Sequence, residues 1–227
     1  MKTPLPFVTC YLLLAFGSLA PAADSPGSFS ARFVDPDAPE NAEVRAIGER
    51  AINRIAITLV NEVSVAVTKS GAEKAIDVCH LKALPLTGEI IAGMPRITGI
   101  KRTSLRLRNP ANAPDAAEQL ALKRVEKNIE SGVLPKVLVQ EIDLPGGKSE
   151  WRVYRPVGVA QQCVTCHGPE DSLTPGLQTR LKERYPSDQA TGYAMGQWRG
   201  LIRVTVSDAP AAPVPAAKAP TPTKKKT

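Results

Sequence analysis

Residues 161–169 read Gln-Gln-Cys-Val-Thr-Cys-His-Gly-Pro, and the rest of the chain is organised around this stretch. Its Cys-x-x-Cys-His pattern is typical of covalent attachment of a c-type haem. Two thiols three positions apart on one helical turn can each bond to a vinyl group of the same porphyrin, which brings the adjacent imidazole beneath the iron. The pattern therefore predicts one covalent haem c, held by Cys163 and Cys166, with His167 as an axial ligand.

Two other kinds of site share part of this pattern. A structural zinc site needs four ligands, usually from two pairs, and the sequence has no recognisable second pair. A thioredoxin-like redox pair normally follows the first strand of a β-α-β unit, whereas this motif lies in the last third of the chain. The haem interpretation is therefore favoured.

Residues 1–22 have the features of a secretory signal peptide. Lys2 supplies a positive charge, residues 7–19 are apolar, and small residues allow cleavage near Ala22. The apolar run is shorter than the ~20 residues that span a bilayer, and we expect no later segment to be long and apolar enough to cross a membrane. The sequence thus predicts an exported protein of the periplasm, with a haem-binding domain over residues 23–208.

Residues 209–227 are rich in Ala and Pro and end in lysines, so we expect a disordered tail. The formal net charge of +7 arises mostly there, since removal of Lys2 and the four tail lysines leaves +2. The basic character therefore does not indicate nucleic-acid binding. A redox partner in the periplasm, of unknown identity, is expected instead.

A long amphipathic helix is predicted over residues 43–68, because apolar residues recur there at steps of three and four. Such a helix is longer than the average in globular proteins. It is either a core helix or one whose far end packs on a second subunit, which would make a homodimer. Ser70 and Gly71 interrupt the pattern, and a second helix is predicted over residues 72–84, ended by Pro85.

The sixth ligand of the iron is sought on this second helix. A helical projection places Cys79 at the centre of the apolar stripe and His80 on the polar flank. Cys79 is also the one thiol left over in an oxidising compartment once the signal is removed and the haem is attached. We favour Cys79 as the axial ligand, with His80 as the alternative and a vacant site third; a buried Cys79 that only fills the core is the plainer explanation.

The remaining pattern indicates an α+β fold, an antiparallel sheet with helices packed on it, including the long N-terminal one. Asp115 is placed to cap a helix, and Gly146-Gly147 to form a hairpin turn. The predicted strands cover residues 103–108, 137–144, 149–156 and 201–206, and the predicted helices residues 116–130 and 175–184. Five arginines are candidates to pair with haem propionates, none favoured over the others: Arg102, Arg106, Arg108, Arg155 and Arg199.

An ordered set of short motifs resembles a family of exported c-type haem proteins, the Tll type, long classified as a domain of unknown function. The matching residues are 75–79, 102–110, 112, 114–115, 163–168, 185–188, 192–193, 196 and 199–200, within about residues 35–207. The resemblance implies a PAS-like fold, as in the cyanobacterial representative, and an iron held by a Cys/His pair that falls on Cys79 and His167. This sequence departs from the family at His80, where a small polar residue is expected, and at Ala116-Ala117, where an aromatic is expected.

Three functions follow from these features. The first is a single-haem protein that transfers electrons or senses redox state, with no enzymatic turnover. The second is a sensor module for a diatomic gas such as NO or CO, which would bind after Cys79 leaves the iron. The third is a small haem peroxidase-type enzyme, which would need an acid–base side chain over an open iron, and no histidine is left for that role if His80 points away.

Overall fold

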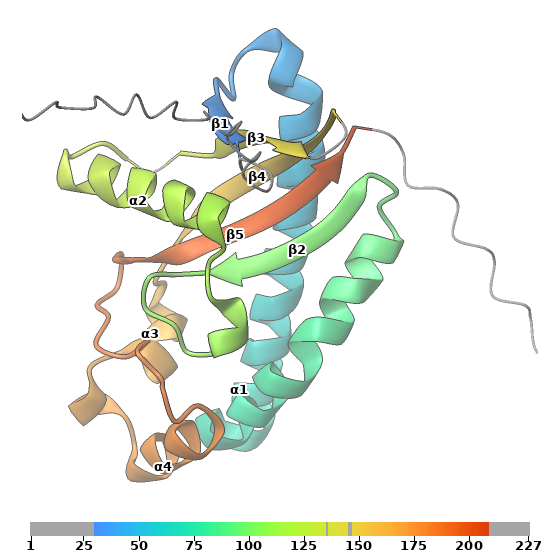
Figure 1. Cartoon of the computed structure of the whole chain (residues 1–227). Coiled ribbons are helices and arrows are strands. Elements are labelled where there is room, and N and C mark those ends of the chain that lie inside the picture. Colours follow the sequence, from blue (N-terminus) through green and yellow to red (C-terminus); the bar gives the residue numbers. More distant parts are fainter. Residues whose placement is uncertain (1–29, 135, 145–146, 209–227) are drawn as a thin grey trace, which may run out of the picture.

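The computed structural model describes residues 30–134, 136–144 and 147–208, without the side chains of residues 78–84 and 148 (Figure 1). The predicted signal peptide and the predicted tail lie outside these residues. Five strands form one antiparallel sheet in the order β1-β3-β4-β5-β2. The strands are β1 (Ser30–Val34), β2 (Ile97–Thr103), β3 (Leu138–Leu144), β4 (Lys148–Gly158) and β5 (Trp198–Ser207). The predicted α+β class, with a long N-terminal helix, is confirmed.

Four α-helices and three short 3₁₀ helices complete the described part of the chain. The α-helices are α1 (Ala42–Ala92), α2 (Ala116–Glu130), α3 (Gln161–His167) and α4 (Pro175–Arg184); the 3₁₀ helices are η1 (Pro39–Asn41), η2 (Pro110–Asn112) and η3 (Glu170–Ser172). The predicted helix over residues 175–184 and the capped helix after Asp115 are both confirmed.

Helices cover both faces of the sheet (Figure 1). Side chains alternate along each strand, so every strand contributes residues to the packing on both faces. On one face, Val153 of β4 and Val204 of β5 are fully buried in a cluster with Ile52 of α1. On the other face, Tyr154 and Leu201 are buried against α2. Neighbouring residues of one strand therefore belong to two separate cores.

Helix α1 is bent into two arms at Gly71, whose φ of 79° and ψ of 164° are not helical. The first arm, residues 42–70, lies on the sheet, and the second, residues 72–92, runs back toward β2 (Figure 1). Glycine adopts positive φ without the steric cost that a side chain would bring. The break predicted at Ser70-Gly71 is confirmed.

The end predicted at Pro85 is wrong, because the helix continues through this residue to Ala92. A proline inside a helix costs about 3 kcal/mol. Beyond it, however, Ile90 is only 4% exposed and packs in the same cluster as Ile52 and Ile55. Burial of one such side chain contributes about 1.5–3 kcal/mol, which offsets most of that cost.

The strand predicted over residues 103–108 is also wrong, since β2 ends at Thr103. The next residues form a turn in which the Ser104 hydroxyl accepts from the Arg106 amide and donates to the Arg199 carbonyl oxygen, 2.7 Å away. Local bonds of this kind compete with the pairing of a sheet. The alternation of Leu105 and Leu107 with polar residues therefore does not mark a strand.

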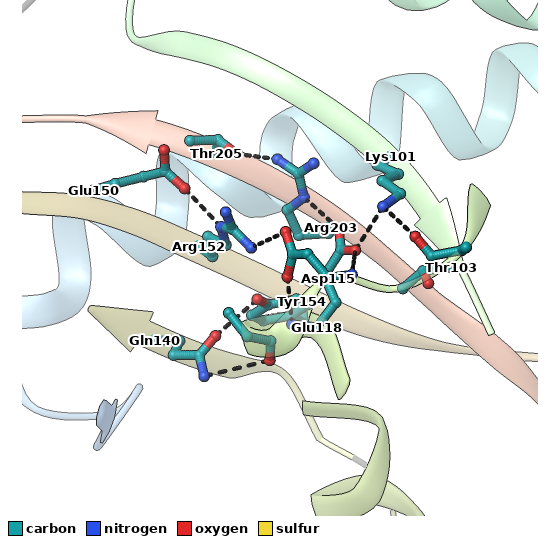
Figure 2. A network of polar contacts seen from close by, with 12 residues as sticks. Lys101, Thr103, Asp115, Glu118, Gln140, Glu150, Arg152, Tyr154, Arg203 and Thr205 are labelled. Atoms are coloured by element: carbon teal, nitrogen blue, oxygen red, sulfur yellow. Dashed lines mark hydrogen bonds and ion pairs between the residues drawn. The ribbon is translucent and has the colours of Figure 1, made fainter. Parts of the chain in front are cut away.

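A buried polar network joins α2 to the sheet. The Glu118 side chain is 0% exposed, and it accepts from Lys101 Nζ at 2.7 Å and from Arg203 Nε at 3.0 Å. Figure 2 shows Glu118 between these two cations, with Asp115 and Arg152 beside it. Asp115 and Glu118 also form a reciprocal capping box at the start of α2. This network fixes the helix on its face of the sheet.

One stretch of the described residues, Pro39–Asp77, has the length and apolar composition of a membrane-spanning helix. The expectation that no later segment has this composition is therefore wrong. A core helix of a soluble protein passes the same test, and Val44, Ile52 and Ile55 of this stretch are buried against the sheet. The absence of a membrane span in the mature protein stays a prediction.

Candidate functional site

The Cys-x-x-Cys-His motif forms the short helix α3 at one end of the sheet, directly after β4. Cys163 and Cys166 form no disulfide within the described residues, and both are partly buried. Cys163 packs against a cluster of Val159, Ala190 and Tyr193, whereas Cys166 packs against the cluster that α4 forms with Ile76 of α1. The predicted arrangement of two thiols on one helical turn, with His167 as the last residue of the helix, is present.

His167 is held in a defined orientation. Its Nδ1 donates a hydrogen bond to the Ala190 carbonyl oxygen, 2.7 Å away, which leaves Nε2 as the ring atom able to bind a metal. Burial lowers the pKa of His167 to about 3, and the positive charges of Arg108 and Arg199 act in the same direction. The imidazole is therefore neutral at physiological pH, as a metal ligand must be.

The loop over residues 188–193 positions the end of α3. The Gly192 amide donates to the Gly168 carbonyl oxygen at 2.7 Å, and the Tyr193 amide donates to that of His167 at 2.8 Å. The ring of Tyr193 also contacts the His167 ring edge-on, with centroids 6.4 Å apart. The loop and the motif therefore form one unit, although more than 20 residues separate them in the chain.

Arg108 connects this loop to the motif from a third segment. Its Nε donates to Asp188 Oδ2 at 2.9 Å, and its Nη2 donates to the Cys166 carbonyl oxygen at 2.6 Å. The two charged side chains are only 13% and 10% exposed. A guanidinium at the C-terminal end of α3 also complements the helix dipole.

Two further arginines lie over Tyr193. The guanidinium carbon of Arg106 is 4.3 Å from the ring centroid and that of Arg199 is 5.4 Å from it. Arg106 donates to the carbonyl oxygens of Gln189 and Thr191, so it also secures the loop. Arg155, by contrast, donates to Asn53 Oδ1 at 2.6 Å on the first arm of α1.

Helix α4 joins the motif to the second arm of α1. Ile76 is 3% exposed and packs with Leu173, Leu177, Leu181 and Tyr185. Beside this contact, Asp77 accepts from Arg180 and Arg184 of α4, both at hydrogen-bond distance. Because Cys166 packs against the same cluster, the second arm lies next to the motif.

Cys79 and His80 belong to the second arm, but their side chains lie outside the described part of the structure. The helical backbone of the second arm continues through both positions, three and four residues after Ile76. The apolar stripe predicted on the helix over residues 72–84 is buried at Ala75 and Ile76, as expected. Which of the two residues is the sixth ligand stays a prediction.

These residues fit a covalently attached haem. The site offers two thiols at the required spacing and a neutral imidazole with an available Nε2. Cys163, Cys166 and His167 are the residues that would hold the group. Among the described side chains, no group of three or more His, Cys, Asp or Glu residues is placed to hold a metal ion by itself.

The profile of the Tll0287-like family matches residues 40–207, which is most of the chain. The protein belongs to the Tll0287-like family. Its structure is similar to the crystal structure of the cyanobacterial heme-protein Tll0287, with a TM-score of 0.52 and 22% sequence identity over 77% of this chain and 99% of that one. At this identity the likeness shows the fold. A comparison with curated proteins finds no significant match.

The contacts explain why the Tll0287-like motifs occur together. The motif at residues 102–110 supplies Arg108, the motif at residues 185–188 supplies Asp188, and the motif at residues 192–193 supplies the amides that bind the end of α3. Sequence reasoning placed Cys163, Cys166 and His167 together, but it missed the bond from His167 to Ala190. That bond uses a backbone oxygen, which leaves no signal in residue type.

Proposed function

We propose that the protein is an exported haem protein of the periplasm, with one c-type haem attached through Cys163 and Cys166. We further propose that it transfers electrons or senses redox state and does not turn over a substrate. The observation that carries this proposal is the fixed, neutral His167 at the end of a helix that also carries the two cysteine thiols of the motif. Membership of the Tll0287-like family, and the printed description of Tll0287 as a heme-protein, support it.

The bound haem would supply a one-electron ferric/ferrous couple. The protein's part is to hold His167 in one tautomer, since the Ala190 carbonyl oxygen accepts from Nδ1 and so directs Nε2 away from it. The pair of Arg108 and Asp188 keeps this loop against α3. A ligand held by rigid neighbours needs little reorganisation when an electron is gained or lost, which suits electron transfer.

For the sixth position we propose Cys79, with His80 as the alternative. The placement of the second arm beside α3 and α4 supports both residues, because Ile76 packs in the cluster that also contacts Cys166. A thiolate from Cys79 would stabilise ferric iron and lower the reduction potential. Cys79→Ser and His80→Ala form a matched pair of variants one residue apart. We expect the first to change the low-spin ferric EPR spectrum and the second to leave it unchanged; the opposite result would assign His80.

Two further proposals concern the binding partners of the mature protein. We propose no binding to nucleic acid and a homodimer formed through α1, on which Ile57 and Val65 are 63% and 48% exposed. Sedimentation of the wild type and of Ile57→Lys tests the dimer, since a charge at the contact should give the mass of a monomer. A wild-type protein that sediments as a monomer at all concentrations would contradict it.

The test of the main proposal is expression with its own signal and a c-type maturation system. We expect periplasmic protein whose mass exceeds that of the processed polypeptide by one haem, and a Cys163→Ala/Cys166→Ala variant that lacks this mass. Colourless wild-type protein would refute the proposal. Reduced protein that binds CO or NO rapidly would instead support gas sensing, and sustained turnover of peroxide would support an enzyme.

A further inference from the structure

We propose that Arg199 pairs with a propionate carboxylate of the haem, through the edge of its guanidinium that carries Nε and Nη2. This inference rests on the proposed function, because it concerns the same group. It selects one of five arginines that the sequence leaves equivalent. In this proposal Arg199 orients the haem at the edge that carries the propionates, in addition to the attachment made by the two thiols.

The first observation is an incomplete set of hydrogen bonds on Arg199. Its Nη1 donates to Ser104 Oγ at 2.8 Å and to the Arg106 carbonyl oxygen at 3.0 Å. Its Nε is buried and has no partner in the described part of the chain. An unpaired buried donor is unfavourable and uncommon in folded proteins, so it marks a place where a partner is missing. The Tyr193 ring face is too weak an acceptor to replace one.

The second observation is that the edge of the guanidinium that carries Nε and Nη2 is fixed in direction. Because Nη1 is held by Ser104 and by the backbone of Arg106, the plane of the guanidinium cannot rotate freely. Nε and Nη2 lie on the same edge of the planar guanidinium, and their parallel N–H bonds match the two oxygens of a carboxylate. The structure thus offers a preformed receptor for a planar anion.

The third observation is the location of this edge. Arg199 lies over Tyr193, whose ring contacts His167 and whose amide donates to the His167 carbonyl oxygen. Arg199 is therefore near the imidazole that would bind the iron.

The other arginines of the site are already occupied. Arg108 is paired with Asp188 and with the Cys166 carbonyl oxygen, and Arg106 donates through Nε and Nη2 to Gln189 and Thr191. Arg155 lies against Asn53 of α1, and Arg102 also has a partner within the described residues. Arg199, by contrast, forms no ion pair within the described residues.

The charges around Tyr193 and the end of α3 support the same conclusion. Arg106 and Arg199 lie over Tyr193 and Arg108 donates to the Cys166 carbonyl oxygen, and among the described residues only Arg108 of these three has an anionic partner, Asp188. A carboxylate brought by the haem would reduce the net positive charge of a partly buried site. Pairing with Arg199 would in turn keep that carboxylate ionised at neutral pH.

The experiment compares the attached haem in Arg199→Gln, Arg199→Lys and the control Arg155→Gln. Arg155 is another of the five arginines, but its guanidinium donates to Asn53 Oδ1 on the first arm of α1. The reduction potential of each purified protein is measured as a function of pH, together with its mass and its far-UV circular dichroism. Arg199→Lys keeps the positive charge but lacks the two parallel N–H bonds, so it still tests the pairing if Arg199→Gln does not fold.

We expect Arg199→Gln to have a lower potential than the wild type, because loss of a cation favours ferric iron. The pH at which its reduction potential changes should rise by about one pH unit or more, since a carboxyl group that loses an arginine partner is protonated at higher pH. Arg199→Lys should fall between the two, and Arg155→Gln should keep the wild-type profile. Attached haem with the same pH profile in Arg199→Gln and Arg199→Lys as in the wild type would overturn the pairing while the proposed function stands. Wild-type protein without haem would instead overturn the proposed function.

Discussion

The Nδ1 atom of His167 lies 2.7 Å from the carbonyl oxygen of Ala190, so a loop just before the last strand sets the orientation of the motif's imidazole. The same loop receives Arg108 from the segment after β2. Three segments far apart in the sequence are therefore needed to orient one ring. The geometry of the site depends on the finished fold, and this dependence can be tested one contact at a time.

Asp188→Asn should lower the free energy of unfolding by about 2–4 kcal/mol. The substitution leaves Arg108 charged and nearly buried without its anion, which is the costly way to break an ion pair. Chemical denaturation measures the effect. The control is Glu183→Gln, which breaks an exposed pair with Arg180 on α4 and should cost less than ~1 kcal/mol. Equal effects of the two variants would show that Asp188 does not support the loop.

Glu118→Gln should be at least as destabilising, by about 3–5 kcal/mol, because two cations would remain around a neutral, fully buried side chain. Asp115→Asn is the matched control in the same capping box. Asn caps a helix as well as Asp does, so only the exposed pair with Arg152 is lost, at a cost below ~1 kcal/mol. A mild effect of Glu118→Gln in urea denaturation would show that the network in Figure 2 contributes little.

Gly48→Ala should destabilise the protein by about 1–3 kcal/mol. A Cβ atom at Gly48 would lie 2.4 Å from Cβ of Val153, so α1 would have to move away from the sheet. Gly88 is exposed on the second arm, with no atom within 4 Å of a Cβ placed there. Gly88→Ala should therefore stabilise the helix by about 0.5–1 kcal/mol, and thermal denaturation should show shifts of opposite sign.

The stability of the protein should fall in acid, in part through Asp115. Burial by itself raises the pKa of this carboxyl, but the Glu118 amide and Arg152 outweigh it, so the folded-state pKa lies below the ordinary value. The stabilisation is complete above the unfolded-state pKa of about 3.9 and is lost as the pH falls through the lower folded-state value. Urea denaturation between about pH 5 and pH 2 should show a steeper loss for the wild type than for Asp115→Asn. Identical slopes would contradict the shift.

The elements that the sequence predicts correctly are those with local signals. Asp115 with Glu118 three residues later marks the start of α2, and Thr174 followed by Pro175 marks the start of α4. The hairpin of β3 and β4 is indicated by Gly146-Gly147 between the two predicted strands, although Gly146 lies outside the described residues. In each case the residues that decide the structure are neighbours in the chain.

The wrong predictions have causes that lie far away in the chain. The helix passes Pro85 because Ile90 reaches the core made by the first arm and the sheet. The turn after Thr103 forms because Ser104 bonds to Arg199, 95 residues later. Within the site, the spacing of Cys163, Cys166 and His167 is local and was predicted. The hydrogen bond to Ala190 and the separate roles of Arg108 and Arg199 depend on tertiary contacts, so they could not be predicted from the sequence.

Gly71 has no atom within 4 Å of the place where a side chain would begin, so the bend in α1 is held by contacts elsewhere. Ile76 fixes one end of the second arm against α4, and Ile90 fixes the other against the sheet. An added residue at the bend would lengthen the connection and leave both anchors in register. One added between the anchors would turn Ile90 by about 100° relative to Ile76. Natural variation in the length of this protein should therefore be tolerated at residue 71 and excluded from residues 76 to 90.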